Sequence, residues 1–336
     1  MEKTEKIKKD ASNLPPVALI LAGYDKVDKK TKMKKKQEII ESYDGDEIYI
    51  GNNKFLYELG GKPVIQYVLD AVFKAEKNGK PLYDKIYLYN DVKSFEEVID
   101  VSKYPNLKVV QMTDSVGGHW KDFYFNHIDY GQRVDVFFGD TPRITSDDAA
   151  WLHEQYSKVL GVEKDQRGII KNMLFGIVRY QDMEDNWLMH RIKFVKRGHN
   201  KGKLKNFVGL TDSQVRVGNS GALIKHHGMD GLMEKESVNF LYNIRKALTP
   251  SNFSKILFLL WKMKYFDLVR QVKNKCINQD QMSTALINII ASIDKIDLSE
   301  YGGSNFVISK NACRWENDID GPLDLAEFRK REKELV

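Results

Sequence analysis

The sequence feature that most constrains the fold is the stretch Val134–Thr145, a short apolar run followed at once by an acidic turn. β-Branched and aromatic side chains dominate its first five residues, which is typical of a buried strand. Pro142 cannot donate to a ladder, so the strand must end before it. Ser146-Asp147-Asp148 then opens a segment with helical periodicity and an N-cap. Asp140 is therefore expected at the carboxyl end of a central strand, where open α/β sheets bind ligands; the alternative is that it only caps a turn.

Strands and helices are expected to alternate around this stretch. Apolar runs indicate strands at residues 17–23, 85–89 and 107–110, and amphipathic periodicity indicates helices at 64–77, 94–102 and 120–130. Residues 113–118 are expected to form a loop of small residues just past a strand end. Such alternation produces right-handed β-α-β units. The predicted fold class is therefore α/β, a three-layer α/β/α arrangement with a mainly parallel central sheet.

Composition narrows the classes of function. The formal charge of +6 arises from 53 basic and 47 acidic residues, which suits an anionic small-molecule substrate. No run of aromatic and basic residues resembles an RNA-binding sheet, so no nucleic-acid partner is expected. Cys276 and Cys313 lack metal-ligand spacing, which favours a reducing, cytoplasmic location. No stretch approaches the ~20 apolar residues of a transmembrane helix.

Four short motifs occur in a fixed order: Leu21-Ala22-Gly23, Lys54 with Leu56 and Gly61-Lys62-Pro63, Gly139-Asp140-Thr141-Pro142, and Asp320-Gly321-Pro322-Leu323-Asp324-Leu325. Together they resemble the nucleotidyltransferase superfamily with a GT-A (Rossmann-like) fold, and most of all its MobA-like NTP transferase branch. The resemblance covers about residues 15–160 and 304–334. It departs from the family where a second glycine and an arginine usually follow the first loop. Tyr24-Asp25-Lys26 and a lysine-rich run stand there instead.

The resemblance implies a division of the chain. Residues 1–14 would be a disordered leader, residues 15–160 the nucleotide-binding half of the domain, and residues 161–228 its acceptor-side strands. Residues 229–300 read as a mainly helical insertion, and residues 301–336 would add a C-terminal strand and helix. The insertion would shape an acceptor pocket, form a homodimer contact or lie peripherally on a membrane; the sequence leaves these roles open.

The resemblance also implies roles for individual residues. Asp140 and Asp320 would bind Mg²⁺, and Lys54 would contact the triphosphate, with Lys62 as a second candidate. The nucleotide would be bordered by Leu21, Ala22, Gly23, Ser115, Gly117 and Gly118. Arg143 and Asn219 would meet the acceptor. Two residues have simpler alternatives: Asp320 as the N-cap of a final helix, and Asn219 as part of an ordinary turn between two strands.

Three functions remain open at this stage. The first is a Mg²⁺-dependent nucleotidyltransferase that moves a nucleoside monophosphate from a nucleoside triphosphate to a phosphorylated sugar, polyol or cofactor, with release of pyrophosphate. The second is a GT-A glycosyltransferase that uses a nucleotide-sugar, although Gly139-Asp140-Thr141-Pro142 lacks the usual Asp-x-Asp. The third is a non-catalytic nucleotide-binding protein, which the altered loop after Gly23 would suit.

Overall fold

The computed structural model describes residues 14–23, 53–113, 115–164, 168, 170–179, 208–209, 214–234, 304–308 and 328–329. The chain divides into two compact units. Unit 1 comprises Met1–Val17, Thr113–Asp135 and Trp151–Cys313, and unit 2 comprises Ala18–Met112, Val136–Ala150 and Arg314–Val336. The leader expected at residues 1–14, apart from its last residue, and nearly all of the helical insertion expected at residues 229–300 lie outside the described residues.

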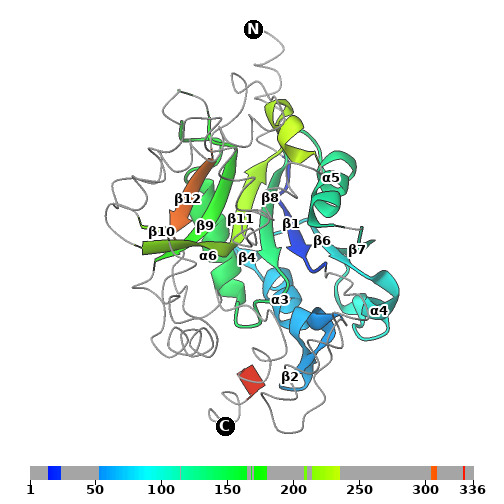
Figure 1. Ribbon diagram of the computed structural model, residues 1–336. Helices are drawn as coiled ribbons and strands as arrows, with labels where there is room; N and C mark the ends of the chain where they lie inside the picture. The colour runs from blue at the N-terminus through cyan, green and yellow to red at the C-terminus, as the bar shows by residue number, and fades with distance from the viewer. Residues whose placement is uncertain are drawn as a thin grey trace, which may run out of the picture. The chain divides into compact units, whose positions relative to one another are not determined.

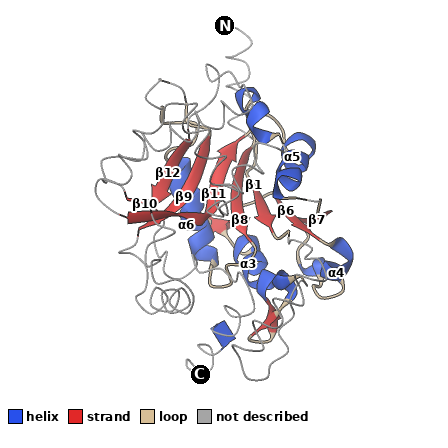
Figure 2. Ribbon diagram, in the orientation of Figure 1, coloured by secondary structure: helices blue, strands red, loops and turns tan. Residues whose placement is uncertain are grey.

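A mixed, mainly parallel sheet carries the fold, which confirms the predicted α/β class (Figures 1 and 2). Its hydrogen-bonded strand order is β12-β9-β11-β8-β1-β6-β7, and β10 pairs with β11. The strands are β1 (Val17–Leu21), β6 (Lys85–Asn90), β7 (Leu107–Gln111), β8 (Arg133–Phe138), β9 (Met173–Arg179), β10 (Val208–Gly209), β11 (Gln214–Ile224) and β12 (Ser304–Ile308). β6 pairs with β7 and β12 with β9 in parallel, whereas β11 runs antiparallel to β9 and β10.

In unit 2, the first helix is shorter than the sequence pattern suggested. β1 is buried along its whole length, and α3 (Val64–Phe73) buries an apolar face. The prediction that this helix continues to residue 77 is wrong. The chain instead forms a hairpin, β4 (Glu76–Lys77) and β5 (Lys80–Pro81). Asn78 and Gly79 have φ values of 55° and 71°, the left-handed turn conformation that Asn-Gly favours in two-residue hairpins.

Two other helices also begin or end at residues other than those predicted, because local capping hydrogen bonds set their boundaries. The helix expected at residues 94–102 is split into α4 (Val92–Glu96) and the 3₁₀ turn η2 (Val101–Lys103), because Asp91 and Asp100 each cap a new start. In unit 1, α5 (Val116–Asn126) begins before residue 120. The Ser115 hydroxyl accepts a hydrogen bond from the Gly118 N–H at 3.1 Å. The expected loop at residues 113–118 is therefore wrong in its second half, since Gly117 and Gly118 lie in the first turn of a helix.

The helix after the organising strand begins as expected, with its cap one residue earlier. α6 (Ser146–Ser157) follows Thr145, whose hydroxyl accepts from the Asp148 N–H at 3.3 Å. The Asp148 carboxylate accepts in return from the Thr145 N–H at 2.9 Å. This reciprocal pair is a capping box, which fixes the point at which the chain turns from β8 into the helix.

The strands of unit 1 hold Asn219 in an unexpected setting. Asn219 lies within the long strand β11, near a shift in its register with β9 between Val217 and Gly221. The interpretation of this segment as a turn between two strands is wrong, because a bulge absorbs the irregularity and the strand continues.

Within the described residues, no helix is both long and apolar enough to cross a membrane.

A buried ionic network in unit 1 fixes the start of β8 against α6. Asp135 is fully buried and accepts two hydrogen bonds from Arg133 at 3.0 Å, and its second oxygen lies 2.7 Å from His153 Nδ1. The Arg133 guanidinium also donates to the His153 carbonyl at 2.7 Å. Burial alone would raise the pKa of Asp135. Arg133 and His153 outweigh that effect and hold the pKa below its ordinary value.

Because the folded-state pKa is depressed, the Asp135 contribution to stability is present above the unfolded value near 4 and is lost as the pH falls through the folded value. We expect Asp135→Asn to lower the free energy of unfolding by about 3 kcal/mol at neutral pH, since it leaves Arg133 uncompensated. The deficit should shrink in acid, where the wild-type carboxylate also becomes protonated. Urea denaturation at neutral pH and at a pH below 4 measures both; an equal deficit at the two pH values would contradict this explanation.

The carboxyl end of β8 leaves no room for a side chain at Gly139. A Cβ atom there would lie 2.6 Å from Ile65 Cδ1, 2.9 Å from Ala22 Cβ and 3.2 Å from Phe55 Cδ1. We expect Gly139→Ala to destabilise the protein by about 1–3 kcal/mol through overpacking. The same substitution in an Ile65→Val background, which removes the nearest methyl group, should cost less. Chemical denaturation of the four proteins in this cycle tests it, and additive effects would show that the contact with Ile65 is not responsible.

Candidate active site

Asp140 lies in the turn that follows β8, as the sequence predicted. The turn is closed by the Thr141 hydroxyl, which donates to the Phe138 carbonyl at 2.9 Å. Gly139 N–H donates to the Leu21 carbonyl at 3.0 Å and so ties this turn to the end of β1. Asp140 is only 7% exposed. Its carboxylate is therefore held at the carboxyl ends of β1 and β8, where α/β folds place their ligands.

Lys54 reaches the same carboxylate from a short 3₁₀ turn, η1 (Lys54–Leu56). Its Nζ lies 2.5 Å from Asp140 Oδ2, although the two residues are 86 positions apart in sequence. The Lys54 side chain is 22% exposed, and its ammonium lies 5.1 Å from the centroid of the Phe55 ring. Burial raises the pKa of the nearby Tyr57 to about 12, although the positive charge of Lys54 acts to lower this pKa. The structure thus brings together two of the three predicted catalytic residues.

The second oxygen of Asp140 has different surroundings. Oδ1 is buried and has no hydrogen-bond partner in the described part of the chain. A buried carboxylate oxygen without a donor is costly, and a cation would satisfy it. The chemistry of Asp140 therefore fits a hard divalent cation, which prefers carboxylate oxygen.

Asp320, the second predicted ligand, lies outside the described residues. The described residues contain no group of three or more His, Cys, Asp or Glu that could hold a metal.

Two asparagines connect this site to the first strand, and the sequence interpretation missed them. Asn90, at the end of β6, is completely buried. Its Nδ2 donates to the Ala22 carbonyl at 3.0 Å, and its Oδ1 accepts from Asn53 Nδ2. Asn53 immediately precedes Lys54. The available signal was that Asn90 is the last residue of a strand and Asp140 closely follows the end of another, so polar side chains were to be expected at the same edge of the sheet.

The other predicted site residues are distributed over both units. Leu21 and Ala22 are buried and Gly23 is half-buried at the end of β1, whereas Arg143 is half-buried between Asp140 and α6. Lys62, in the small hairpin of β2 (Glu58–Leu59) and β3 (Lys62–Pro63), pairs at 3.5 Å with Asp70 and is half-exposed. The remaining four predicted residues belong to unit 1: Ser115, Gly117, Gly118 and Asn219.

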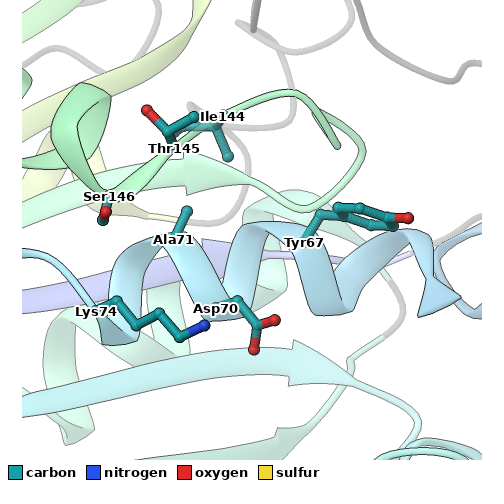
Figure 3. A pocket seen from close by; sticks show the side chains of 7 residues that line it. All are labelled: Tyr67, Asp70, Ala71, Lys74, Ile144, Thr145 and Ser146. Carbon is teal, nitrogen blue, oxygen red and sulfur yellow. The ribbon is translucent and has the colours of Figure 1, made fainter. Parts of the chain in front are cut away.

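A small open pocket of about 210 Å³ lies elsewhere in unit 2, between α3 and the start of α6 (Figure 3). Its lining residues are Tyr67, Asp70, Ala71, Lys74, Ile144, Thr145 and Ser146. Figure 3 shows Ala71 pointing from α3 toward Ile144 and Thr145. None of the predicted site residues lines this pocket, and Asp70 already accepts a hydrogen bond from the Tyr104 hydroxyl at 2.5 Å.

Comparison with known proteins relates the fold, and the fold alone, to other structures. No family model matches the sequence, and no curated protein matches it. Among solved structures, a hypothetical transferase from Thermus thermophilus aligns with 93% of this chain and 100% of its own, at 13% identity and a TM-score of 0.54.

Two further structures align at lower TM-scores. A 4-diphosphocytidyl-2C-methyl-D-erythritol synthase from Anaerococcus prevotii covers 95% of this chain and 98% of its own, at 12% identity and a TM-score of 0.44. A CMP:2-keto-3-deoxy-manno-octonic acid synthetase complexed with CTP covers 96% of this chain and 100% of its own, at 11% identity and 0.45. The alignment with the Thermus protein supports the mixed α/β fold with a mainly parallel central sheet that the sequence predicted.

Proposed function

We propose that this protein is a Mg²⁺-dependent nucleotidyltransferase of the MobA-like branch that transfers a nucleoside monophosphate from a nucleoside triphosphate to a phosphorylated small molecule. The acceptor would be a sugar, polyol or cofactor phosphate. The observation that carries the proposal is the contact between Lys54 and Asp140 at the carboxyl end of β8, together with the buried second oxygen of Asp140. A cation and a carboxylate in this position are what a triphosphate and its metal require.

The reaction joins two anions and needs little covalent help from the protein. A phosphate oxygen of the acceptor attacks the α-phosphorus of the triphosphate, and the bond from that phosphorus to the bridging oxygen of the β-phosphate breaks. The electron pair of the broken bond leaves with pyrophosphate. The protein has to align the two reactants and neutralise the charge on the leaving group. No nucleophilic side chain is required.

Asp140 would bind the metal through Oδ1, and Asp320 would provide a second carboxylate. Support for Asp320 comes from the sequence motif Asp320-Gly321-Pro322-Leu323-Asp324-Leu325. Bound Mg²⁺ would supply positive charge that neutralises the phosphates.

Lys54 would neutralise the triphosphate once the metal shares the charge of Asp140. In the structure its ammonium balances the Asp140 carboxylate. Because its side chain is partly exposed, the ammonium can turn toward an anion on the solvent side without crossing the core. Lys62 would be the second lysine, after release from Asp70.

The remaining predicted residues would contact the two substrates. The end of β1, from Leu21 to Gly23, would border the nucleotide. The start of α5 would contact the nucleotide through its N-cap, Ser115, and two glycines of its first turn, Gly117 and Gly118. Arg143 and Asn219 would contact the acceptor. A cytoplasmic location and a homodimer remain part of this proposal.

A pyrophosphate-release screen tests the proposed reaction. It combines Mg²⁺ and the four ribonucleoside triphosphates with a panel of sugar, polyol and cofactor phosphates. We expect one combination to release pyrophosphate, and Asp140→Asn and Lys54→Met each to reduce the rate about 10²–10³-fold, as loss of one charge-stabilising group typically does. Lys103→Met, which removes an exposed lysine outside the site, should leave the rate unchanged. Full activity in Asp140→Asn would contradict the assignment.

Metal binding can be measured without knowing either substrate. Mn²⁺ titration followed by electron paramagnetic resonance reports the free ion directly. We expect Asp140→Asn to weaken Mn²⁺ binding at least about tenfold, because it removes the carboxylate charge. Lys54→Met should bind Mn²⁺ as well as or better than wild type, since the competing ammonium is gone. Equal binding by wild type and Asp140→Asn would show that Oδ1 is not a metal ligand.

A further inference from the structure

We propose that Asn53 and Asn90 are positioning residues that couple the segment Leu21-Ala22-Gly23 at the end of β1, called the nucleotide loop below, to the turn that carries Lys54. The inference rests on the proposed function and deepens it, since it names residues outside the family motifs that would set triphosphate affinity. It is carried by a continuous chain of side-chain and backbone hydrogen bonds among three segments of unit 2: the end of β1, the η1 turn and the end of β6.

Asn90 is the centre of this chain of hydrogen bonds. Its side chain is fully buried and bonded at both ends. Nδ2 donates to the Ala22 carbonyl at 3.0 Å, while Oδ1 accepts from Asn53 Nδ2 and from the Asp91 N–H, the latter at 2.8 Å. A buried amide bonded to three different groups holds them in one arrangement, because breaking any of these bonds would leave a polar atom unpaired in the interior.

Asn53 transmits this arrangement to Lys54. Besides donating to Asn90, its side chain accepts from the Phe55 N–H at 3.3 Å, and so caps the η1 turn. The Leu56 N–H donates to the Asn53 carbonyl at 3.0 Å, which closes the turn around Lys54. The backbone of Lys54 is thus fixed on both sides, and only its own side-chain rotations remain to place the ammonium.

The bond from Asn90 to Ala22 also orients the nucleotide loop. No peptide bond in the described residues is cis, so the carbonyl of Ala22 and the N–H of Gly23 point in opposite directions. Because Asn90 holds the Ala22 carbonyl toward the interior, the Gly23 N–H is turned away from Asn90. A backbone N–H fixed in this way at a strand end is a suitable donor to a phosphate or a base.

The substitution that tests the coupling is Asn53→Ser. Serine caps a helical turn about as well as asparagine, yet it is too short to reach Asn90 and adds no charge beside the triphosphate. Asn90→Ala removes the centre of the chain of bonds. Asn106→Ser is the matched control, because Asn106 Nδ2 donates to the Tyr83 carbonyl at 3.0 Å and none of the predicted site residues takes part in that bond.

Isothermal titration calorimetry of each full-length protein with Mg²⁺ and each ribonucleoside triphosphate gives the decisive comparison. We expect Asn53→Ser and Asn90→Ala to weaken triphosphate binding about tenfold or more, the effect of losing one buried hydrogen bond. Asn106→Ser should bind like wild type. In steady-state assays Asn53→Ser should raise KM for the triphosphate and leave KM for the acceptor unchanged.

The outcomes separate this inference from the function on which it rests. A wild-type protein that binds no triphosphate in the presence of Mg²⁺ would overturn both. Wild-type binding with unchanged affinity in Asn53→Ser would overturn the coupling alone, and so would an equal loss in Asn106→Ser, which would indicate a general structural effect. If Asn90→Ala does not fold, as judged by circular dichroism, Asn53→Ser decides the question.

Discussion

The interaction on which the candidate site depends is the contact between the Lys54 ammonium and the Asp140 carboxylate. Burying a carboxylate is unfavourable unless an opposite charge or hydrogen-bond donors compensate it. Here Lys54 compensates one oxygen of Asp140, and the other oxygen is buried without a donor in the described part of the chain. A buried carboxylate with only one of its two oxygens compensated lowers the free energy of unfolding of the protein. That cost is understandable if the second oxygen serves a ligand, which is how strained or unsatisfied groups arise at functional sites.

The surrounding structure serves to hold these two groups. Gly139 lets the chain pass closely by Ala22, Ile65 and Phe55, and its N–H is bonded to the Leu21 carbonyl. The pair of asparagines ties the Lys54 turn to the same end of β1. The end of a strand is held rigidly by the sheet on one side and is open to a ligand on the other. A few side chains and backbone groups there can therefore contact a ligand while the core stays in place. Rigid placement is what phosphoryl-group transfer needs most, since alignment of the reactants contributes much of the rate enhancement.

The sequence predicted the strands well because β1 is a continuous apolar run and β6, β7 and β8 are rich in β-branched, aromatic and other apolar residues. Helix ends were predicted less well, because single hydrogen bonds decide them: the Ser115 cap begins α5 early, and the Asn78-Gly79 turn ends the helical segment after α3. A shared site for Lys54 and Asp140 was implied by the family resemblance and not by any local pattern. Asn90 could have been found from its place at the end of a predicted strand, but its pairing with Asn53, 37 positions away, leaves no periodic signal.

The measurement that tests the central claim most directly is a crystal structure of the protein with Mn²⁺ and a non-hydrolysable nucleoside triphosphate, with anomalous diffraction locating the metal. The account predicts an anomalous peak within coordination distance of Asp140 Oδ1. It also predicts the triphosphate against Lys54 and the end of β1. A metal and triphosphate bound elsewhere, with Lys54 still paired to Asp140, would show that this pair only stabilises the fold and would contradict the account.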